Sequence, residues 1–148
     1  MVNKKKLIVV SGHFNPLHVG HLDMIEHAGT MGEVLVIVNN DAQQLLKKGK
    51  IIIPQDERLR IVESLEATCY SLLALDEGAP VIETIRKVAE MFSETHEIIF
   101  ANGGDRDAPA VVPESSVCEE LGIAMVYGIG GTDKTTSSTR INKRLGLQ

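Results

Sequence analysis

Short apolar runs alternate along this chain with segments that have helical periodicity. Residues 7–10 and 34–38 are rich in β-branched side chains, which favours buried strands. Elsewhere apolar residues recur every three or four positions, as Val81, Ile85 and Val88 do, which is typical of amphipathic helices. Strands that alternate with helices predict an α/β fold with a parallel sheet. Because parallel connections are right-handed, helices are expected on both faces of that sheet.

The expected elements follow each other in a regular order. Strands are expected at residues 7–10, 34–38, 70–75, 98–101 and 124–127, and helices at 20–28, 42–48, 55–67, 81–92, 114–121 and 138–145. Asp41 is placed to cap the second helix, and Gly122 to end the fifth. We therefore expect one domain over residues 1–148, with a Rossmann-like, doubly wound, five-stranded parallel sheet. Ligands bind such sheets beyond the carboxyl ends of the strands, where the strand order reverses.

The composition indicates a globular protein and excludes several classes. Hydrophobic residues make up 43% and charged residues 24%, and no apolar run approaches the roughly 18 residues that span a bilayer. The basic start leads into a run too short for a secretion signal, so we expect a cytoplasmic protein with no membrane partner. Cys69 and Cys118 lie too far apart for a paired metal motif. A net charge of −5 disfavours a nucleic-acid polymer as partner but allows a small phosphorylated ligand.

Three of the five histidines lie in GHFNPLHVGH, residues 12–21, which joins the first expected strand to the first expected helix. His18 and His21 could serve core packing, a metal site or an anion site. A metal site needs a third ligand, and no cysteine or further histidine is placed to supply one. Gly20 lets the backbone come close, Pro16 fixes the loop, and the helix dipole favours negative charge. An anion site at the helix N-terminus is therefore the preferred interpretation.

The last loop, GIGGTDKTTSST, departs from a phosphate-binding P-loop at one decisive position. Asp133 precedes Lys134 where a P-loop needs glycine, and its carboxylate would repel phosphates, so we reject a P-loop. Ser137, Ser138 and Thr139 offer hydroxyl groups at the start of the last expected helix. Such hydroxyls suit phosphate oxygens, although an ordinary helix cap explains them equally well.

Other polar groups follow the second and fourth expected strands. Lys47 and Lys48 end a short helix, and Arg58 lies on the next one; each is compatible with an ordinary solvated surface. The run NGGDR, residues 102–106, follows the fourth strand. Its two glycines would let the backbone approach a flat ligand, although a plain turn is also compatible with it.

These segments, in this order, resemble the cytidylyltransferase-like nucleotidyltransferases. That family carries G-[TSY]-F-[DN]-x-x-H-x-G-H after its first strand, which residues 12–21 match closely, with His13 at the second position. Lys48 matches its lysine after the second strand, and Arg58 an arginine in the following helix. Residues 103–105 match its Gly-Gly-Asp turn, and residues 137–141 its S-[ST]-T-x-I motif. The H-x-G-H motif also marks class I aminoacyl-tRNA synthetases, but these are much longer and carry a second lysine motif that is absent here.

Within the family, the chain is most similar to the sugar-phosphate and polyol-phosphate branch. That branch includes the adenylyltransferase domain of ADP-heptose synthase and glycerol-3-phosphate cytidylyltransferase. The resemblance implies transfer of AMP or CMP from ATP or CTP to a small phosphorylated acceptor, such as a heptose 1-phosphate, with release of pyrophosphate. It also implies Mg²⁺ bridging the triphosphate, no metal held by protein ligands alone, and a homodimer.

The resemblance further implies roles for individual residues. His18, His21 and Lys48 are expected to be catalytic, by stabilising charge on the triphosphate. The expected nucleotide contacts are Gly12, His13, Phe14, Asn15, Gly20, Gly103, Gly104, Asp105, Ser137, Ser138 and Thr139, and the expected acceptor contacts are Arg58, Asn39 and Lys47. Because the acceptor phosphate is already a nucleophile, catalysis would consist mainly of positioning and charge stabilisation.

Three departures from the branch leave other acceptors open. His13 stands where threonine is common, Asn15 and Pro16 replace the usual F-D-x, and Arg106 stands where an aromatic residue is frequent. An adenylyltransferase for a cofactor precursor (nicotinamide mononucleotide, phosphopantetheine or FMN) is one alternative. A nucleotide-binding module without turnover is the other, and the joint presence of His18, His21, Lys48 and residues 137–141 speaks against it.

Overall fold

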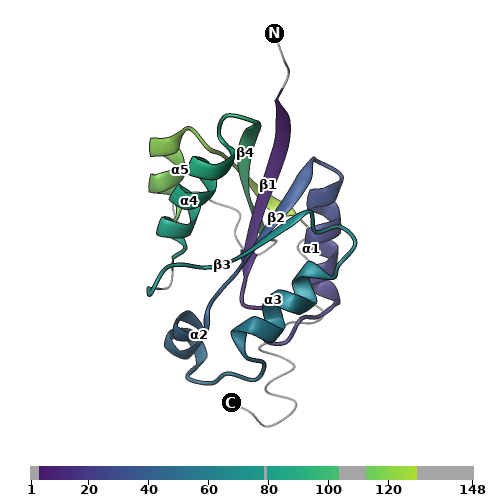
Figure 1. Ribbon diagram of the computed structural model, residues 1–148, viewed down its shortest axis with the longest axis vertical. Coiled ribbons are helices and arrows are strands. Elements are labelled where there is room, and N and C mark those ends of the chain that lie inside the picture. The colour runs from purple at the N-terminus through teal and green to yellow at the C-terminus, as the bar shows by residue number, and fades with distance from the viewer. Residues whose placement is uncertain (1–3, 79, 104–112, 130–148) are drawn as a thin grey trace.

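The computed structural model describes residues 4–78, 80–103 and 113–129, and in this part of the chain it contains one five-stranded, all-parallel sheet (Figure 1). The strand order is β3-β2-β1-β4-β5. The strands are β1 (Lys5–Gly12), β2 (Glu33–Val38), β3 (Tyr70–Leu73), β4 (His96–Gly103) and β5 (Ala124–Ile129). This confirms the predicted α/β fold and its Rossmann-like sheet. The expected strands matched the apolar centres and several observed strands also include polar ends, but β3 ends at Leu73 and not at residue 75 as predicted.

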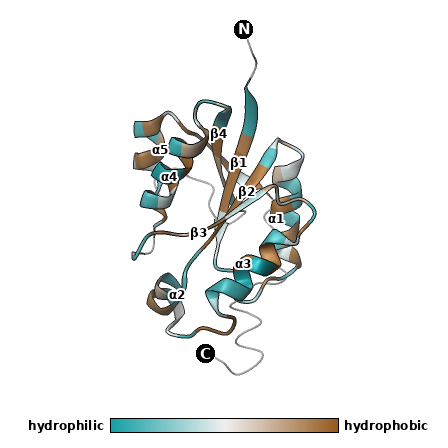
Figure 2. Ribbon diagram, in the orientation of Figure 1, coloured by the Kyte–Doolittle hydropathy of each residue, from teal (hydrophilic) through white to brown (hydrophobic). Residues whose placement is uncertain are grey.

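The helices cover both faces of the sheet, as the right-handed connections predict. They are α1 (Val19–Gly29), α2 (Asp41–Lys48), α3 (Gln55–Glu63), α4 (Ile82–Phe92) and α5 (Ser115–Leu121). In β1, Leu7 and Val9 belong to the core cluster under α4 and α5, while Ile8 and Val10 belong to the cluster under α1 and α3. Figure 2 shows the resulting apolar strands in the centre of the molecule.

Two predicted helix boundaries are also wrong. The cap of α2 is Asn40, not Asp41: the Asn40 side chain accepts a hydrogen bond from the Gln43 backbone N–H, and the Gln43 side chain accepts one from the Asn40 N–H. This reciprocal pair is a capping box, and Asp41 is the first helical residue. The third helix ends at Glu63 instead of reaching residue 67, because the chain turns there to enter β3. The expected helix at 138–145 lies outside the described residues.

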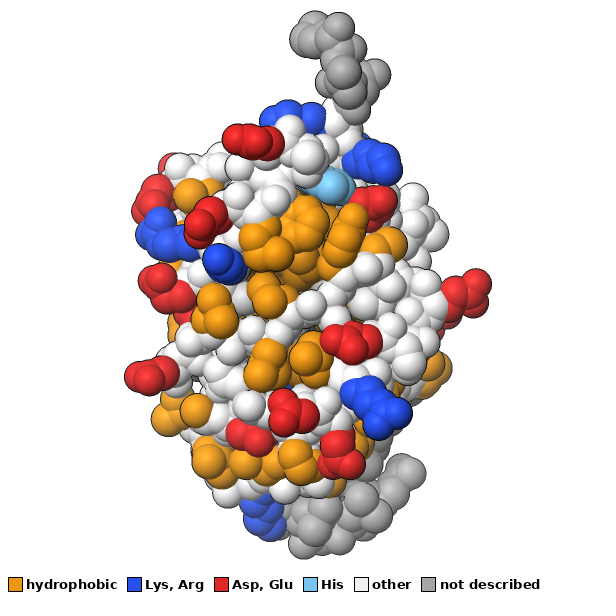
Figure 3. Space-filling model, viewed as in Figure 1, with side chains coloured by type: hydrophobic (Ala, Val, Ile, Leu, Met, Phe, Trp, Pro, Cys, Tyr) orange, Lys and Arg blue, Asp and Glu red, His pale blue; other side chains and the backbone are white. Residues whose placement is uncertain are grey.

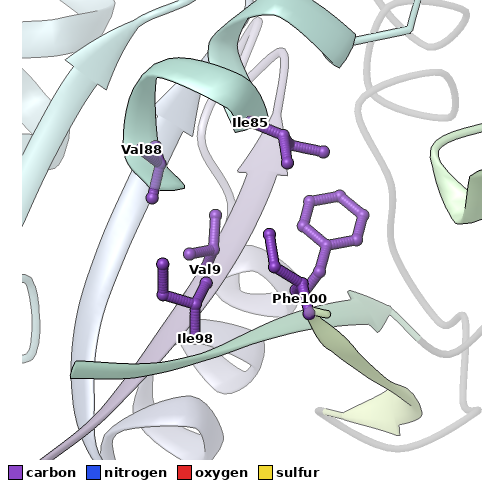
Figure 4. Close-up of a pocket in the computed structure, with 6 residues that line it drawn as sticks. Val9, Ile85, Val88, Ile98 and Phe100 are labelled. Carbon is purple, nitrogen blue, oxygen red and sulfur yellow. The ribbon is translucent and has the colours of Figure 1, made fainter. Parts of the chain in front are cut away.

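An apolar hollow lies between α4 and the sheet (Figure 4). It is lined by Val9, Ile85, Val88, Ile98, Phe100 and Ile123. These side chains offer no polar atom that could bind a charged ligand, so the hollow belongs to the core. On the surface, Figure 3 shows hydrophobic side chains gathered on the face that carries the β3 edge, with acidic and basic residues around them. No helix in the described part of the chain is long and apolar enough to cross a membrane.

The strand order reverses beside β1. From β1 the chain adds β2 and β3 on one side, and then β4 and β5 on the other. The carboxyl ends of β1 and β4 therefore flank the crevice in which such sheets bind ligands. The loop after β1, residues 13–18, is the segment singled out from the sequence, and it opens at this point.

Candidate functional site

The turn from β1 into α1 is shaped by Phe14. This residue has a φ of 53°, a left-handed value that is rare for an aromatic residue, and its ring is buried. A Cβ at position 12 would lie 2.8 Å from the Phe14 Cζ atom, so Gly12 is needed to leave room for the ring. The Phe14 ring also meets the His21 ring edge-on, with 4.8 Å between centroids. Phe14 thus supports the loop from inside the protein.

His18 and His21 are held by the backbone of their own loop. His18 is the N-cap of α1, and its Nδ1 accepts a hydrogen bond of 3.0 Å from the Gly20 N–H. The His18 N–H in turn donates to His21 Nδ1 at 3.2 Å. Since both Nδ1 atoms accept, each neutral ring must carry its proton on Nε2. Both imidazoles therefore keep an Nε2–H donor that these contacts do not use.

The two imidazoles are close enough to disfavour protonation of each other. Their ring centroids lie 3.8 Å apart in a stacked arrangement. Burial, together with the charges of His18, Lys47 and His13, lowers the pKa of His21 to about 3. Burial also lowers the pKa of His18. At neutral pH the site therefore presents neutral rings that donate hydrogen bonds, not imidazolium cations.

The first turn of α1 uses part of its own backbone capacity. The Gly20 N–H donates to the His18 ring, and the N–H groups of His21 and Leu22 donate to the His18 carbonyl. In this structure these amides have internal partners. The donors that the loop leaves for an anion are thus mainly the two Nε2–H groups.

Helix α2 brings a lysine near these rings. Lys47 is exposed near the end of α2, and its charge contributes to the lowered pKa of His21. Lys48 ends the helix, but its side chain is outside the described part. The helix is anchored at its start, because the Asn40 side chain donates to the carbonyls of Ala74 and Asp76. The Gln43 side chain donates to the Gly78 carbonyl as well.

Arg58 and Asn39, the other two expected acceptor contacts, are both buried. The Arg58 guanidinium donates to the carbonyls of His13, Asn39 and Ile53 and to the Asp41 carboxylate, and its side chain has no exposed surface. The Asn39 amide nitrogen donates to the Gln43 side chain at 3.0 Å. In this conformation both side chains make their hydrogen bonds to groups of the protein itself, near the carboxyl ends of β1 and β2.

Asn15 is also buried, and its orientation is fixed. Its Oδ1 accepts hydrogen bonds from the N–H groups of Ile52 and Ile53, at 3.1 and 2.8 Å. The amide nitrogen must therefore face the other way, where it is buried without a hydrogen-bond partner from the described residues. A buried N–H donor without an acceptor destabilises the folded protein unless a ligand or a water molecule accepts its hydrogen bond.

The remaining expected contacts fall largely outside the described residues. Gly103 ends β4, which pairs with β5 through a register shift near this point. The described part does not include Gly104, Asp105, Ser137, Ser138 or Thr139.

Two residues that hold α2 in place, Asn40 and Gln43, were not singled out from the sequence. The N-x-x-Q capping pattern could have indicated Gln43.

Fold and site together define a class of protein: an α/β domain whose neutral histidine pair and nearby lysine lie where parallel sheets bind nucleotides. The profile of the cytidylyltransferase-like family matches residues 9–111, and the chain belongs to that family. The family resemblance seen in its motifs is thereby confirmed.

Curated relatives cover most of this chain. The bifunctional protein HldE of Geobacter sulfurreducens is 30% identical over 96% of the chain, and HldE of Aliarcobacter butzleri is 28% identical over 94%. The chain spans only 28% and 27% of these two proteins. It therefore corresponds to little more than a quarter of their length.

Solved structures share the fold. A lipopolysaccharide core biosynthesis protein from Thermoplasma volcanium aligns with a TM-score of 0.64 and 23% identity, over 87% of this chain and 99% of that one. A candidate nicotinate-nucleotide adenylyltransferase from Vibrio parahaemolyticus aligns with a TM-score of 0.60 and 19% identity, over 95% and 86%. At these identities the likeness concerns the fold alone.

Proposed function

We propose that this nucleotidyltransferase-family protein transfers AMP or CMP from a nucleoside triphosphate to a small sugar phosphate or polyol phosphate. The observation that carries the proposal is the pair of neutral imidazoles, His18 and His21, whose Nδ1 atoms are held by backbone N–H groups. Two fixed Nε2–H donors at the carboxyl edge of the sheet suit the oxygens of a triphosphate. The resemblance of its motifs to the sugar-phosphate branch of the family supports an acceptor of that chemistry.

In the proposed reaction an oxygen of the acceptor phosphate attacks the α-phosphorus. A new P–O bond forms there, and the bond from the α-phosphorus to the oxygen bridging to the β-phosphate breaks, so pyrophosphate leaves. The attacking oxygen is already anionic and needs no general base. The catalytic task is to hold the two anions together and to stabilise the charge that moves onto the leaving group.

The residues divide this task. His18 and His21 donate Nε2–H hydrogen bonds to triphosphate oxygens, Lys48 neutralises the α-phosphate region, and Lys47 binds the acceptor. The unpaired amide nitrogen of Asn15 would gain a partner from a ligand oxygen. Residues 103–105 would frame the base, and residues 137–139 would hold the departing pyrophosphate.

Mg²⁺ is proposed to arrive on the triphosphate as part of the substrate. The described residues contain no group of three or more histidine, cysteine, aspartate or glutamate side chains that could hold a metal ion. Asp41, the acidic residue that follows β2, is engaged by Arg58. On the triphosphate, Mg²⁺ would neutralise part of the phosphate charge.

Transfer to a cofactor precursor is the second candidate. Asn15 and Pro16 make the loop read F-N-P, which resembles nicotinamide mononucleotide adenylyltransferases more than the sugar-phosphate branch. The acceptor panel in the test below therefore contains both classes.

The test is pyrophosphate release from ATP or CTP, each with Mg²⁺, in the presence of single acceptors. The panel comprises heptose 1-phosphate, glucose 1-phosphate, glycerol 3-phosphate, nicotinamide mononucleotide and phosphopantetheine. Turnover with a sugar or polyol phosphate supports the proposal, and turnover only with a cofactor precursor replaces it by the second candidate. Nucleotide binding without turnover for any pair would refute the enzyme and favour a binding module. Sedimentation analysis of the same sample tests the expected homodimer.

A further inference from the structure

Arg58 is the largest side chain that is fully buried in the described part of the protein. It lies in the first half of α3, four residues before Val62, the other buried residue of that helix. Only 1% of Arg58 is exposed. A guanidinium group is always charged and carries five N–H donors, so burial is tolerable only if the surrounding groups accept most of them.

Three separate segments supply those acceptors. Nη1 donates to the His13 carbonyl at 2.7 Å and to the Asn39 carbonyl at 2.6 Å. Nε donates to the Ile53 carbonyl at 2.7 Å, and Nη2 donates to the Asp41 carboxylate at 2.7 Å. One side chain therefore joins the loop after β1, the start of α2 and the segment that leads into α3.

Neighbouring hydrogen bonds connect the same segments. The Asn39 N–H donates to the Gly12 carbonyl at 2.9 Å, and the Asp41 N–H donates to the Gln55 side chain at 2.9 Å. Asn15 accepts from the N–H groups of Ile52 and Ile53. The charged guanidinium of Arg58 lies among these hydrogen bonds and connects the same segments.

We infer that Arg58 is a positioning residue, which fixes the loop that leads to His18 and the first turn of α1 relative to the helix carrying Lys47 and does not itself bind the acceptor. This inference rests on the proposed function. His13 lies five residues before His18, and Asp41 begins the helix that carries Lys47. To bind an acceptor phosphate, Arg58 would have to leave buried carbonyls without a donor, at a cost for each.

Lysine cannot reproduce this arrangement. An ammonium group is a single point with three donors, whereas the guanidinium reaches four acceptors through a planar fork. Arg58→Lys keeps the charge and much of the volume but should lose contact with at least two of the carbonyls. Arg60 lies on the same helix with an exposed side chain, and Arg60→Lys is the matched control.

The test uses the whole chain without any ligand, so that it stands apart from the transferase assay. In Arg58→Lys, hydrogen exchange at the amides of Asn39, Ile52 and Ile53 should accelerate about tenfold or more, while the control changes by less than about twofold. Nitrogen-15 spectra of the histidine rings supply the second reading. Loosening of the loop should raise the titration midpoint of His21 by about one unit or more in Arg58→Lys only.

Three outcomes overturn the inference. Unchanged amide exchange would show that Arg58 does not hold these segments. Faster exchange with an unchanged His21 titration would show a merely structural residue. A shift of the Arg58 Nε–H signal on adding glucose 1-phosphate or glycerol 3-phosphate, with Mg²⁺ and ATP or CTP present, would show acceptor binding. If Arg58→Lys does not fold, Asp41→Asn removes only the carboxylate and is expected to give the same two changes in smaller measure.

If no acceptor and nucleotide pair reacts, the proposed function fails, but the amide and histidine readings still decide the role of Arg58. If turnover is found and both readings are unchanged, the proposed function stands and the positioning role is refuted.

Discussion

At the scale of single residues, His18 has two functions that a substitution can separate. Its Nδ1 caps α1, and its Nε2–H is the group proposed for catalysis. Asparagine is a good helix cap and can place an oxygen near the Nδ1 position, but it has no group at the Nε2 position. In His18→Asn we expect kcat to fall about 100-fold while the thermal midpoint changes little. Steady-state kinetics and calorimetry measure the two quantities.

Two further variants complete this comparison. His18→Ala should show the same loss of kcat and an additional loss of about 1 kcal/mol in unfolding free energy, because it also removes the cap. His27→Asn changes an exposed histidine of the same helix and should leave kcat within about twofold. A stable His18→Asn protein with full kcat would contradict the catalytic role.

His21 is expected to make the folded protein sensitive to acid. Its pKa is about 3 in the folded state and has an ordinary value of 6.5, so between these values the unfolded chain binds a proton that the folded chain does not. Its contribution to stability is therefore complete above pH 6.5 and is lost as the pH falls towards 3. Below about pH 6 the unfolding free energy should decline by about 1.4 kcal/mol per pH unit from this group.

Urea unfolding between pH 7 and 5 tests this decline against His21→Asn, in which the slope should be smaller by that amount. The pKa of Glu33 is also lowered, which changes the unfolding free energy with pH in the same direction. This effect occurs below 4.5, the usual carboxylate pKa, and therefore outside the range from pH 7 to 5. Equal slopes in the two proteins would show that His21 is not held neutral by the fold.

At the scale of elements, the start of α2 connects the site to the loop after β3. Asn40 caps the helix through Oδ1 and donates through Nδ2 to the carbonyls of Ala74 and Asp76. Asn40→Ala loses all of these bonds and should cost about 2–3 kcal/mol in unfolding free energy. Asn40→Ser retains a cap but cannot reach the carbonyls, so it should cost about 1 kcal/mol less than alanine. Chemical denaturation at neutral pH distinguishes the two losses, and equal losses would show that the cap contributes nothing.

The elements also show how far sequence reasoning reaches. The strands and helices were predictable because apolar periodicity reports burial directly, as in β2 and α4. His18 and His21 were found because their motif follows a strand and opens a helix. The burial of Arg58 was not predicted, because polar side chains carry no burial signal of their own. Arg58 lies four residues before Val62, which places both side chains on one face of the helix, and this spacing could have indicated that Arg58 is buried.

At the scale of the whole molecule, the site lies between two halves of one sheet, with β1 at the centre. The loop after β1 is tied to β2 and α2 by buried hydrogen bonds, while the fourth strand approaches from the other side. A ligand bound across this junction would hold both halves together. The stability of the entire chain should therefore report nucleotide binding, and it should identify the base that the sequence left undecided.

Thermal unfolding with ATP or CTP, each with Mg²⁺, tests this coupling. A ligand at 100 times its dissociation constant adds about 2.7 kcal/mol to the folded state. For a chain of 148 residues this corresponds to a rise of roughly 5–10 °C in Tm. We expect one of the two nucleotides to give this rise and the other to give much less, because the proposed reaction uses one nucleotide as its donor. In His18→Asn the same nucleotide should give a smaller rise, since a triphosphate contact is lost. Equal shifts in this variant and the unaltered protein would place the triphosphate away from His18 and would contradict the site.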